Sequence, residues 1–94
     1  MTSIGTYAFY SCYSLASITI QDSVTNIESH AFYDCYGMAE YHLKRITPPT
    51  LPSATTFGNI PSDCLIYVPA GSLNAYQTAT NWSAYSSYMR EEPV

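Results

Sequence analysis

The chain has 94 residues, of which 47% are hydrophobic and 11% are charged, and its formal net charge is −4 at pH 7. This length suffices for one small domain with one core. Its only cationic residues are Lys44, Arg45 and Arg90, which excludes a basic face for nucleic acid or an anionic membrane. The longest apolar run, five residues from Cys64 to Val68, is too short for membrane insertion.

The N-terminal stretch MTSIGTYAFY lacks the charged start and the apolar centre of a signal peptide. We therefore expect either an intracellular protein or a piece of a longer exported chain. Ten tyrosines alongside few lysines and glutamates are unusual for a cytosolic enzyme. Such a composition suits an exposed recognition surface.

Residues 1–23 return, with substitutions, as residues 24–46. Eight of the 23 aligned positions are identical, and five of them form the phrase AFYxCY at 8–13 and 31–36. A period of 23 residues falls within the roughly 20–29 residues typical of leucine-rich solenoids. Each copy is therefore predicted to form one coil, and stacked coils would share a continuous core.

Two kinds of apolar spacing recur in each copy. SITI (17–20) and EYHL (40–43) alternate, which predicts short strands with an apolar inner face. The predicted inward residues are Ile18, Ile20, Tyr41 and Leu43. AFYSCYSL instead spaces Phe9, Cys12 and Leu15 three residues apart, which favours a tight helical or 3₁₀ turn with one buried edge.

Residues 47–69 form a third, degenerate copy if the offset grows to 25 residues. Phe57 then takes the place of Phe32, and Ile60 takes that of Cys35. LIYV supplies a third strand with Ile66 and Val68 facing inward. The insertion falls in TPPTLPSATT, whose three prolines are expected to prevent regular pairing and to leave a loop.

Residues 70–94 lose the repeat and predict a C-terminal cap of two short helices followed by a tail. Ser72 is the expected N-cap of a helix over 73–80, and Asn81 that of a helix over 82–89. A frayed tail is expected over 90–94. The apolar residues predicted to cover the last coil are Leu73, Tyr76, Trp82 and Tyr85.

The repeated pattern resembles the BspA-like leucine-rich repeat, whose unit is about 23 residues long. It is carried by Thr2, Ile4, Ala8, Phe9, Cys12, Leu15, Ile18 and Ile20, and again by Thr25, Ile27, Ala31, Phe32, Cys35, Met38, Tyr41 and Leu43. The ending over 47–85 is similar to the terminal segment of such proteins from anaerobic gut and oral bacteria. The resemblance implies a repeat solenoid of short strands and helical or 3₁₀ turns, in a large exported surface protein without catalytic residues.

The cysteines and histidines form no catalytic or metal-binding pattern. Cys12, Cys35 and Cys64 lie 23 and 29 residues apart without a CxxC motif, so neither a metal nor another cofactor is expected. Buried free thiols are favoured over a Cys12–Cys35 disulfide, which the spacing of stacked coils would also permit, and Cys64 is expected to be partly exposed. His30 and His42 are interpreted as solvated, so no enzyme is predicted.

Two surfaces are candidate binding sites. The first is the outer face of the strands, where Thr19, His42 and Tyr67 are expected in register beside Gln21 and Lys44. The second is a tyrosine ladder, because tyrosine offers a large contact area at little rotamer entropy. It consists of Tyr10, Tyr33, Tyr13 and Tyr36. Against both stands the interpretation that these side chains are merely solvated or cover the seams between coils.

The resemblance implies an adhesin-like module on the cell surface or in a secreted protein. The implied partner is a host extracellular-matrix or cell-surface protein or glycan. The alternative is a structural cap and spacer that ends a longer solenoid and has no ligand. In either case the first coil presents an uncapped edge that invites self-association.

Overall fold

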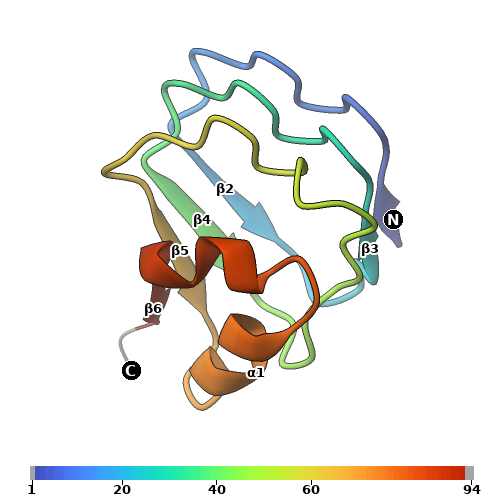
Figure 1. The fold of residues 1–94 in the computed structure, drawn as a ribbon, viewed down its shortest axis with the longest axis vertical. Coiled ribbons are helices and arrows are strands. Elements are labelled where there is room, and N and C mark those ends of the chain that lie inside the picture. Colours follow the sequence, from blue (N-terminus) through green and yellow to red (C-terminus); the bar gives the residue numbers. More distant parts are fainter. Residues whose placement is uncertain (1, 93–94) are drawn as a thin grey trace.

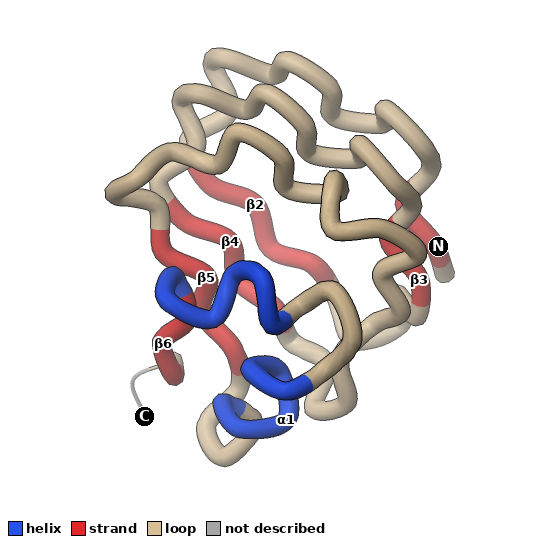
Figure 2. Tube along the Cα trace, viewed as in Figure 1, coloured by secondary structure: helices blue, strands red, loops and turns tan. Residues whose placement is uncertain are grey.

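The computed structural model describes residues 2–92, which wind into three stacked coils followed by a short helical segment (Figure 1). The strands of the three coils are β1 (Ser3–Ile4), β2 (Ser17–Ile20), β3 (Asn26–Ile27), β4 (Glu40–Leu43) and β5 (Leu65–Val68). They are followed by helix α1 (Leu73–Thr78), the 3₁₀ helix η1 (Ser83–Tyr88) and β6 (Met89–Glu91). Figure 2 shows that loops and turns make up much of each coil.

A parallel sheet in the order β2-β4-β5-β6 lies along one side of the stack. Ser17 pairs with Glu40, and Glu40 pairs with Leu65, so the register advances by the repeat period and then by two residues more. A second pair, β1 with β3, is also parallel. The three strands predicted from alternation are confirmed. Their inner residues from Tyr41 to Val68 are at most 1% exposed.

The phrase AFYxCY forms a series of single turns. Backbone bonds between residues three apart, such as Ala8 N–H to the Gly5 carbonyl (3.0 Å), close them, but successive turns do not continue into a helix. Each coil instead donates to the next one. Phe9 N–H bonds to the Ala31 carbonyl at 2.7 Å, and Phe32 N–H bonds to the Thr56 carbonyl at 2.8 Å. These bonds fix the phrase in register from coil to coil.

Three phenylalanines at the same position of each coil form the centre of the core. The rings of Phe9 and Phe32 stack at 5.0 Å, and those of Phe32 and Phe57 stack at 5.5 Å. The ring of Tyr41 on β4 meets Phe32 and Phe57 edge-on at 5.2 and 4.8 Å. The inner faces of strand and turn therefore pack against each other, and their outer faces lie on opposite sides of the core. The placement of Phe57 by the 25-residue offset is confirmed.

The proline-rich insertion is more regular than expected. Thr50 forms an isolated parallel bridge with Asn26, and its backbone N–H bonds to the Thr25 carbonyl at 2.9 Å. The prolines on either side still prevent a longer ladder, because they lack the N–H group it requires. The expectation of an unpaired loop was therefore wrong at Thr50.

The C-terminal segment packs its aromatic residues against the third coil. Tyr76 and Trp82 are at most 1% exposed, and Trp82 Nε1 donates to the Pro49 carbonyl at 2.7 Å. The rings of Trp82 and Tyr85 lie 5.5 and 5.3 Å from that of Phe57. Burial of the predicted aromatic residues is confirmed, and Leu73 is partly buried beside them.

The helix boundaries differ from those predicted. Helix α1 ends at Thr78, and Ser72 precedes it without a side-chain cap bond, since Ser72 is itself buried. The second segment is a 3₁₀ helix preceded by Trp82 rather than by Asn81. Asn81 adopts a left-handed backbone (φ 67°), and its amide donates to the Leu51 carbonyl at 2.6 Å. Its role is thus to hold the insertion rather than to cap a helix.

The end of the chain is not a frayed tail over residues 90–92. Met89 is buried opposite Ile66, and the strand β6 that it begins contains Arg90 and Glu91. Glu92 N–H then bonds to the Val68 carbonyl at 2.8 Å. A fourth parallel strand explains the difference, because β5 offers an unpaired edge that a three-residue segment can fill. The prediction for 93–94 lies outside the described residues.

Cys64 is 1% exposed, so the expectation of partial exposure was wrong. It directly precedes β5, and its thiol lies in the core although the sequence alignment placed Ile60 in the cysteine position. Cys12, Cys35 and Cys64 are free thiols, and Cys35 Sγ donates to the Phe9 carbonyl at 3.1 Å. Burial raises the pKa of Cys35, and it raises that of Cys64 to about 12. Both thiols are therefore protonated and unreactive near neutral pH.

Candidate functional site

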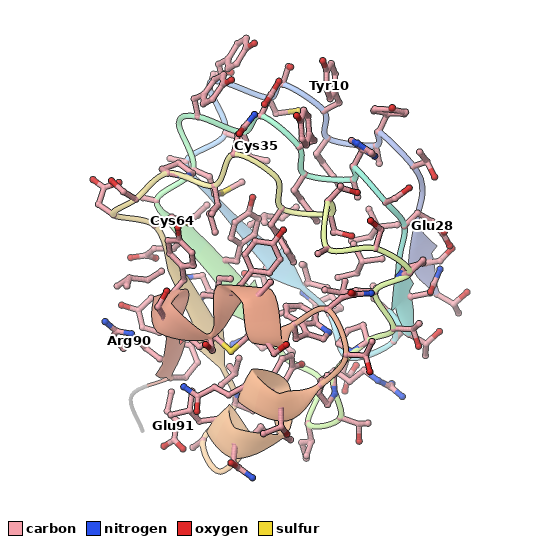
Figure 3. All side chains as sticks on the ribbon, viewed as in Figure 1. Tyr10, Glu28, Cys35, Cys64, Arg90 and Glu91 are labelled. Atoms are coloured by element: carbon pink, nitrogen blue, oxygen red, sulfur yellow. The ribbon has the colours of Figure 1, made fainter. Side chains whose placement is uncertain are left out.

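An exposed set of tyrosines covers the turn side of the first two coils. We call it the tyrosine face, and it consists of Tyr7, Tyr10, Tyr13, Tyr33 and Tyr36. Four of these side chains are 47–58% exposed, and Tyr33 is half-buried. Figure 3 shows Tyr10 pointing away from the ribbon here, far from Arg90 on β6. Large exposed rings gathered on one side are unusual for a surface without a partner.

The rings of the tyrosine face form two parallel stacks. Tyr10 lies 5.9 Å from Tyr33, and Tyr13 lies 5.4 Å from Tyr36, with interplanar angles of 3° and 4°. Stacking turns the ring edges and hydroxyl groups toward solvent rather than the ring faces. Both predicted tyrosine pairs are therefore brought together. Each presents a row of apolar edges with hydrogen-bonding tips.

The third coil ends one of these stacks with a glycine. A Cβ added at Gly58 would lie 2.3 Å from the Tyr33 ring, so the ring rests directly on this backbone. Nearby, the carboxylate of Asp34 accepts from the Asn59 amide at 2.5 Å and from the Tyr36 hydroxyl at 3.2 Å. Both contacts limit the freedom of the tyrosines before any ligand arrives. A surface held in this way loses less conformational entropy on binding.

His30 belongs to the tyrosine face, which the sequence interpretation missed. It was interpreted as solvated, but its half-buried ring stacks on Tyr7 at 5.1 Å and lies 4.9 Å from Tyr33. Its Nδ1 atom also lies 3.4 Å from the Thr55 hydroxyl. Tyr7 and His30 occupy the same position in the first and second copies. That aromatic equivalence was the signal available in the sequence.

Backbone strain recurs under the tyrosine face. Tyr7 and His30 have left-handed backbones, with φ of 62° and 60°. Ser11, Asp34 and Asn59, at another shared position, have φ between 55° and 62°. Left-handed geometry in a non-glycine residue costs on the order of 1 kcal/mol and persists only where the surroundings enforce it. Here the coil-to-coil hydrogen bonds enforce it, and the result is a fixed direction for the rings.

The outer side of the main sheet forms the second candidate, which we call the strand face. It consists of Thr19, His42, Tyr67, Gln21 and Lys44. Thr19 pairs with His42 and His42 with Tyr67, so the predicted register is found, and the imidazole stacks on the Tyr67 ring at 5.0 Å. Gln21 and Lys44 are exposed just beyond β2 and β4. Arg90 on β6, opposite Tyr67, extends this row beyond the prediction.

His42 is held between two carboxylates rather than solvated. Its Nδ1 lies 2.5 Å from Glu92 and its Nε2 lies 2.8 Å from Glu40. A neutral imidazole can donate from only one nitrogen, so donation to both carboxylates requires the protonated ring. The hydrogen bond from Glu92 is the main reason that the pKa of His42 is raised. Glu92 was missed because residues 90–94 were taken as a tail.

The tyrosine face and the strand face do not merge into one site, because the packed phenylalanines lie between them. No group of three or more His, Cys, Asp or Glu side chains suited to a metal ion occurs among residues 2–92. Within the same residues, no helix is both long and apolar enough to cross a membrane. Both candidates are exposed surfaces rather than enclosed catalytic clefts.

These features define a repeat protein built from short parallel strands and hydrogen-bonded turns in register. A family model described as "BspA type Leucine rich repeat region (6 copies)" matches residues 1–68, and the chain belongs to this family. Members are typically found at the cell surface or secreted, and such repeats are generally binding modules rather than enzymes. No curated protein matches the sequence.

Proposed function

We propose that this chain is a non-enzymatic binding module of a surface-exposed or secreted bacterial protein. Its ligand is a protein or glycan of the host extracellular matrix or cell surface, and its role is adhesion. Its three coils form a short solenoid, closed at the third coil by α1 and η1. The family is the reason to expect a binding role, and the tyrosine face is the observation that supports a site in this chain.

The tyrosine face fits a broad, shallow ligand. Its ring faces are occupied by stacking, so the contacts it offers are ring edges and hydroxyl groups. Such a surface suits a polypeptide segment or a sugar chain that accepts hydrogen bonds along its length. The repeat spacing extends the same pattern from one coil to the next. A ligand that lies along the stack therefore meets equivalent groups twice.

The strand face is the second place for the same function. Thr19 is exposed, whereas His42 and Tyr67 are half-buried and stack on each other. The nitrogens of His42 are already occupied by Glu40 and Glu92. A ligand on this face would have to use the exposed rim around them. For this reason the tyrosine face ranks first.

A structural cap and spacer is the alternative function. The observation in its favour is the aromatic packing of Trp82 and Tyr85 on Phe57, together with the charged strand β6. These features would end a longer stack without any ligand. In that case recognition would belong to other repeats.

Binding of the intact chain to immobilised matrix proteins and surface glycans distinguishes the two functions. The tyrosine-face variant carries Tyr10→Ala, Tyr13→Ala and Tyr36→Ala, and the strand-face variant carries Thr19→Ala, His42→Ala and Tyr67→Ala. Ile46→Ala, at a side chain 73% exposed and outside both faces, is the matched control. We expect saturable binding that weakens at least about tenfold in the tyrosine-face variant and is unchanged in the control.

Loss confined to the strand-face variant would move the site to the sheet. Absence of binding by the unaltered chain to every component of the panel would favour the cap and spacer.

A further inference from the structure

The first coil has an open apolar side, which we call the first-coil face. It consists of Ile4, Phe9, Leu15, Ile18 and Ile20. Phe9, Leu15 and Ile18 are only half-buried, whereas their equivalents Phe32, Met38 and Tyr41 in the second coil are each 1% exposed. The first-coil face thus carries the same side chains that a neighbouring coil buries elsewhere in the stack.

A hollow of about 300 Å³ lies in this face. Its apolar lining includes Phe9, Ile18 and Val24, and the side chains of Thr19 and Gln21 lie at its margin. The Phe9 ring packs on Phe32 with one side, and its other side belongs to this lining. A second apolar side chain of similar size could therefore continue the phenylalanine stack in the hollow.

Strand β2 borders the hollow and is an edge of the main sheet. The carbonyls of Ala16 and Ile20 accept bonds from the second coil. Because backbone groups alternate in direction along a strand, Ser17 and Thr19 turn theirs toward the open side. Such an edge is a template for pairing with another strand.

Charge distinguishes this edge from the other end of the sheet. No residue from 2 to 21 carries a charged side chain, although the whole chain has a net charge of −4. The opposite edge strand, β6, contains Arg90 and Glu91. Charged side chains protect an edge against pairing, so the molecule has one adhesive edge and one protected edge.

We propose that the first-coil face joins two copies of this chain, with β2 of one copy antiparallel to β2 of its partner. The face meets itself across a two-fold axis, so the assembly closes as a dimer and does not grow into a fibre. Two uncharged faces approach without like-charge repulsion, which a partner with a charged surface would not match. The proposal concerns a surface other than the two ligand-binding candidates and does not depend on either of them.

The test is sedimentation velocity of the full chain over a concentration series. A dimer of twice the 10.4 kDa chain mass is expected to appear as concentration rises. Ile18→Lys places two like charges against each other across the axis and should weaken the dimer at least about tenfold. Ile46→Lys makes the same chemical change at an exposed site in the second coil and should leave the dimer intact.

Hydrogen exchange provides a readout that does not depend on the variants. Amides of Ser17 and Thr19 should gain protection as the concentration rises, while those of β6 should not. Circular dichroism of Ile18→Lys verifies that the variant is folded. A chain that stays monomeric up to about 1 mM would overturn the proposal. A dimer that persists in folded Ile18→Lys, or growth beyond a dimer, would overturn it too.

Discussion

The first and third coils place equivalent side chains in opposite surroundings. Phe9 is half-buried beside a hollow, whereas Phe57 is fully buried between Phe32 and the rings of Trp82 and Tyr85. Ile18 on β2 is half-buried, whereas Ile66 on β5 has no exposed surface. The same repeat position is thus surface-like at one end and core-like at the other. In a stack, burial is decided by the neighbouring coil and not by the residue alone.

Truncation of the phenylalanine stack should reveal this difference most strongly. Phe32→Ala leaves a cavity between two rings and should cost about 3–5 kcal/mol of the free energy of unfolding. Phe9→Ala removes a side chain with one open side and should cost only about 1–2 kcal/mol. Urea denaturation monitored by circular dichroism measures both. A loss below about 1 kcal/mol for Phe32→Ala would contradict the stacked core.

Because total stability of a domain this small is only about 5 kcal/mol, Phe32→Ala may be too unstable to assay. Phe32→Leu then serves as the milder variant. The order of the two positions, with the second coil more sensitive than the first, should remain.

The glycines sharpen the comparison between the two ends. Gly58→Ala drives a Cβ into the Tyr33 ring and should cost about 1–3 kcal/mol through overpacking. Gly5→Ala in the first coil is the matched control, because nothing lies within 4 Å of its Cβ, and it should change stability by less than about 0.5 kcal/mol. Thermal and urea unfolding compare the two. Equal effects would mean that Tyr33 does not rest on the third coil.

The smallest expected effect concerns pH and the C-terminal strand. The pKa of His42 is raised from its ordinary value of 6.5, mainly by the hydrogen bond with Glu92. The folded state therefore binds this proton more tightly than the unfolded state does. The resulting stabilisation is fully present below about pH 6.5 and is lost as pH rises through the folded pKa. For a partly exposed group it should not exceed about 1 kcal/mol.

Unfolding of the unaltered chain and of His42→Gln at several pH values measures this effect. The advantage of the unaltered chain should shrink as pH rises above 6.5. Glu92→Gln removes the main partner and should bring the pKa of His42 closer to its ordinary value, which NMR can follow in a His30→Gln background. An advantage that grows with pH would contradict the assigned contacts.

Much of the fold could be predicted because the sequence repeats. Period and alternation together identified β2, β4 and β5, and the position of Phe57. Strand β6 could not be predicted, because MRE contains one apolar residue and its pairing depends on the edge left by β5. Cys64 was misjudged because the two-residue insertion moves it out of the alignment and into the core.

The candidate surfaces were predictable to the same extent. Tyr10 with Tyr33, and Tyr13 with Tyr36, follow from identity at equivalent positions. The left-handed backbone at His30 does not follow from any local sequence preference, since the hydrogen bonds between coils impose it. Contacts between repeats and the unrepeated end, such as His42 with Glu92, likewise require the three-dimensional structure.

The parallel register has a mechanical consequence. The described N-terminal strand lies in the first coil and the last strand lies at the far edge of the sheet, so tension on the ends acts across the stack (Figure 1). Bonds between coils would then open one after another instead of being sheared together. The first coil, held from one side only, should detach first. Each released 23-residue coil would lengthen the chain by about 80 Å, so the stack would yield to force in steps.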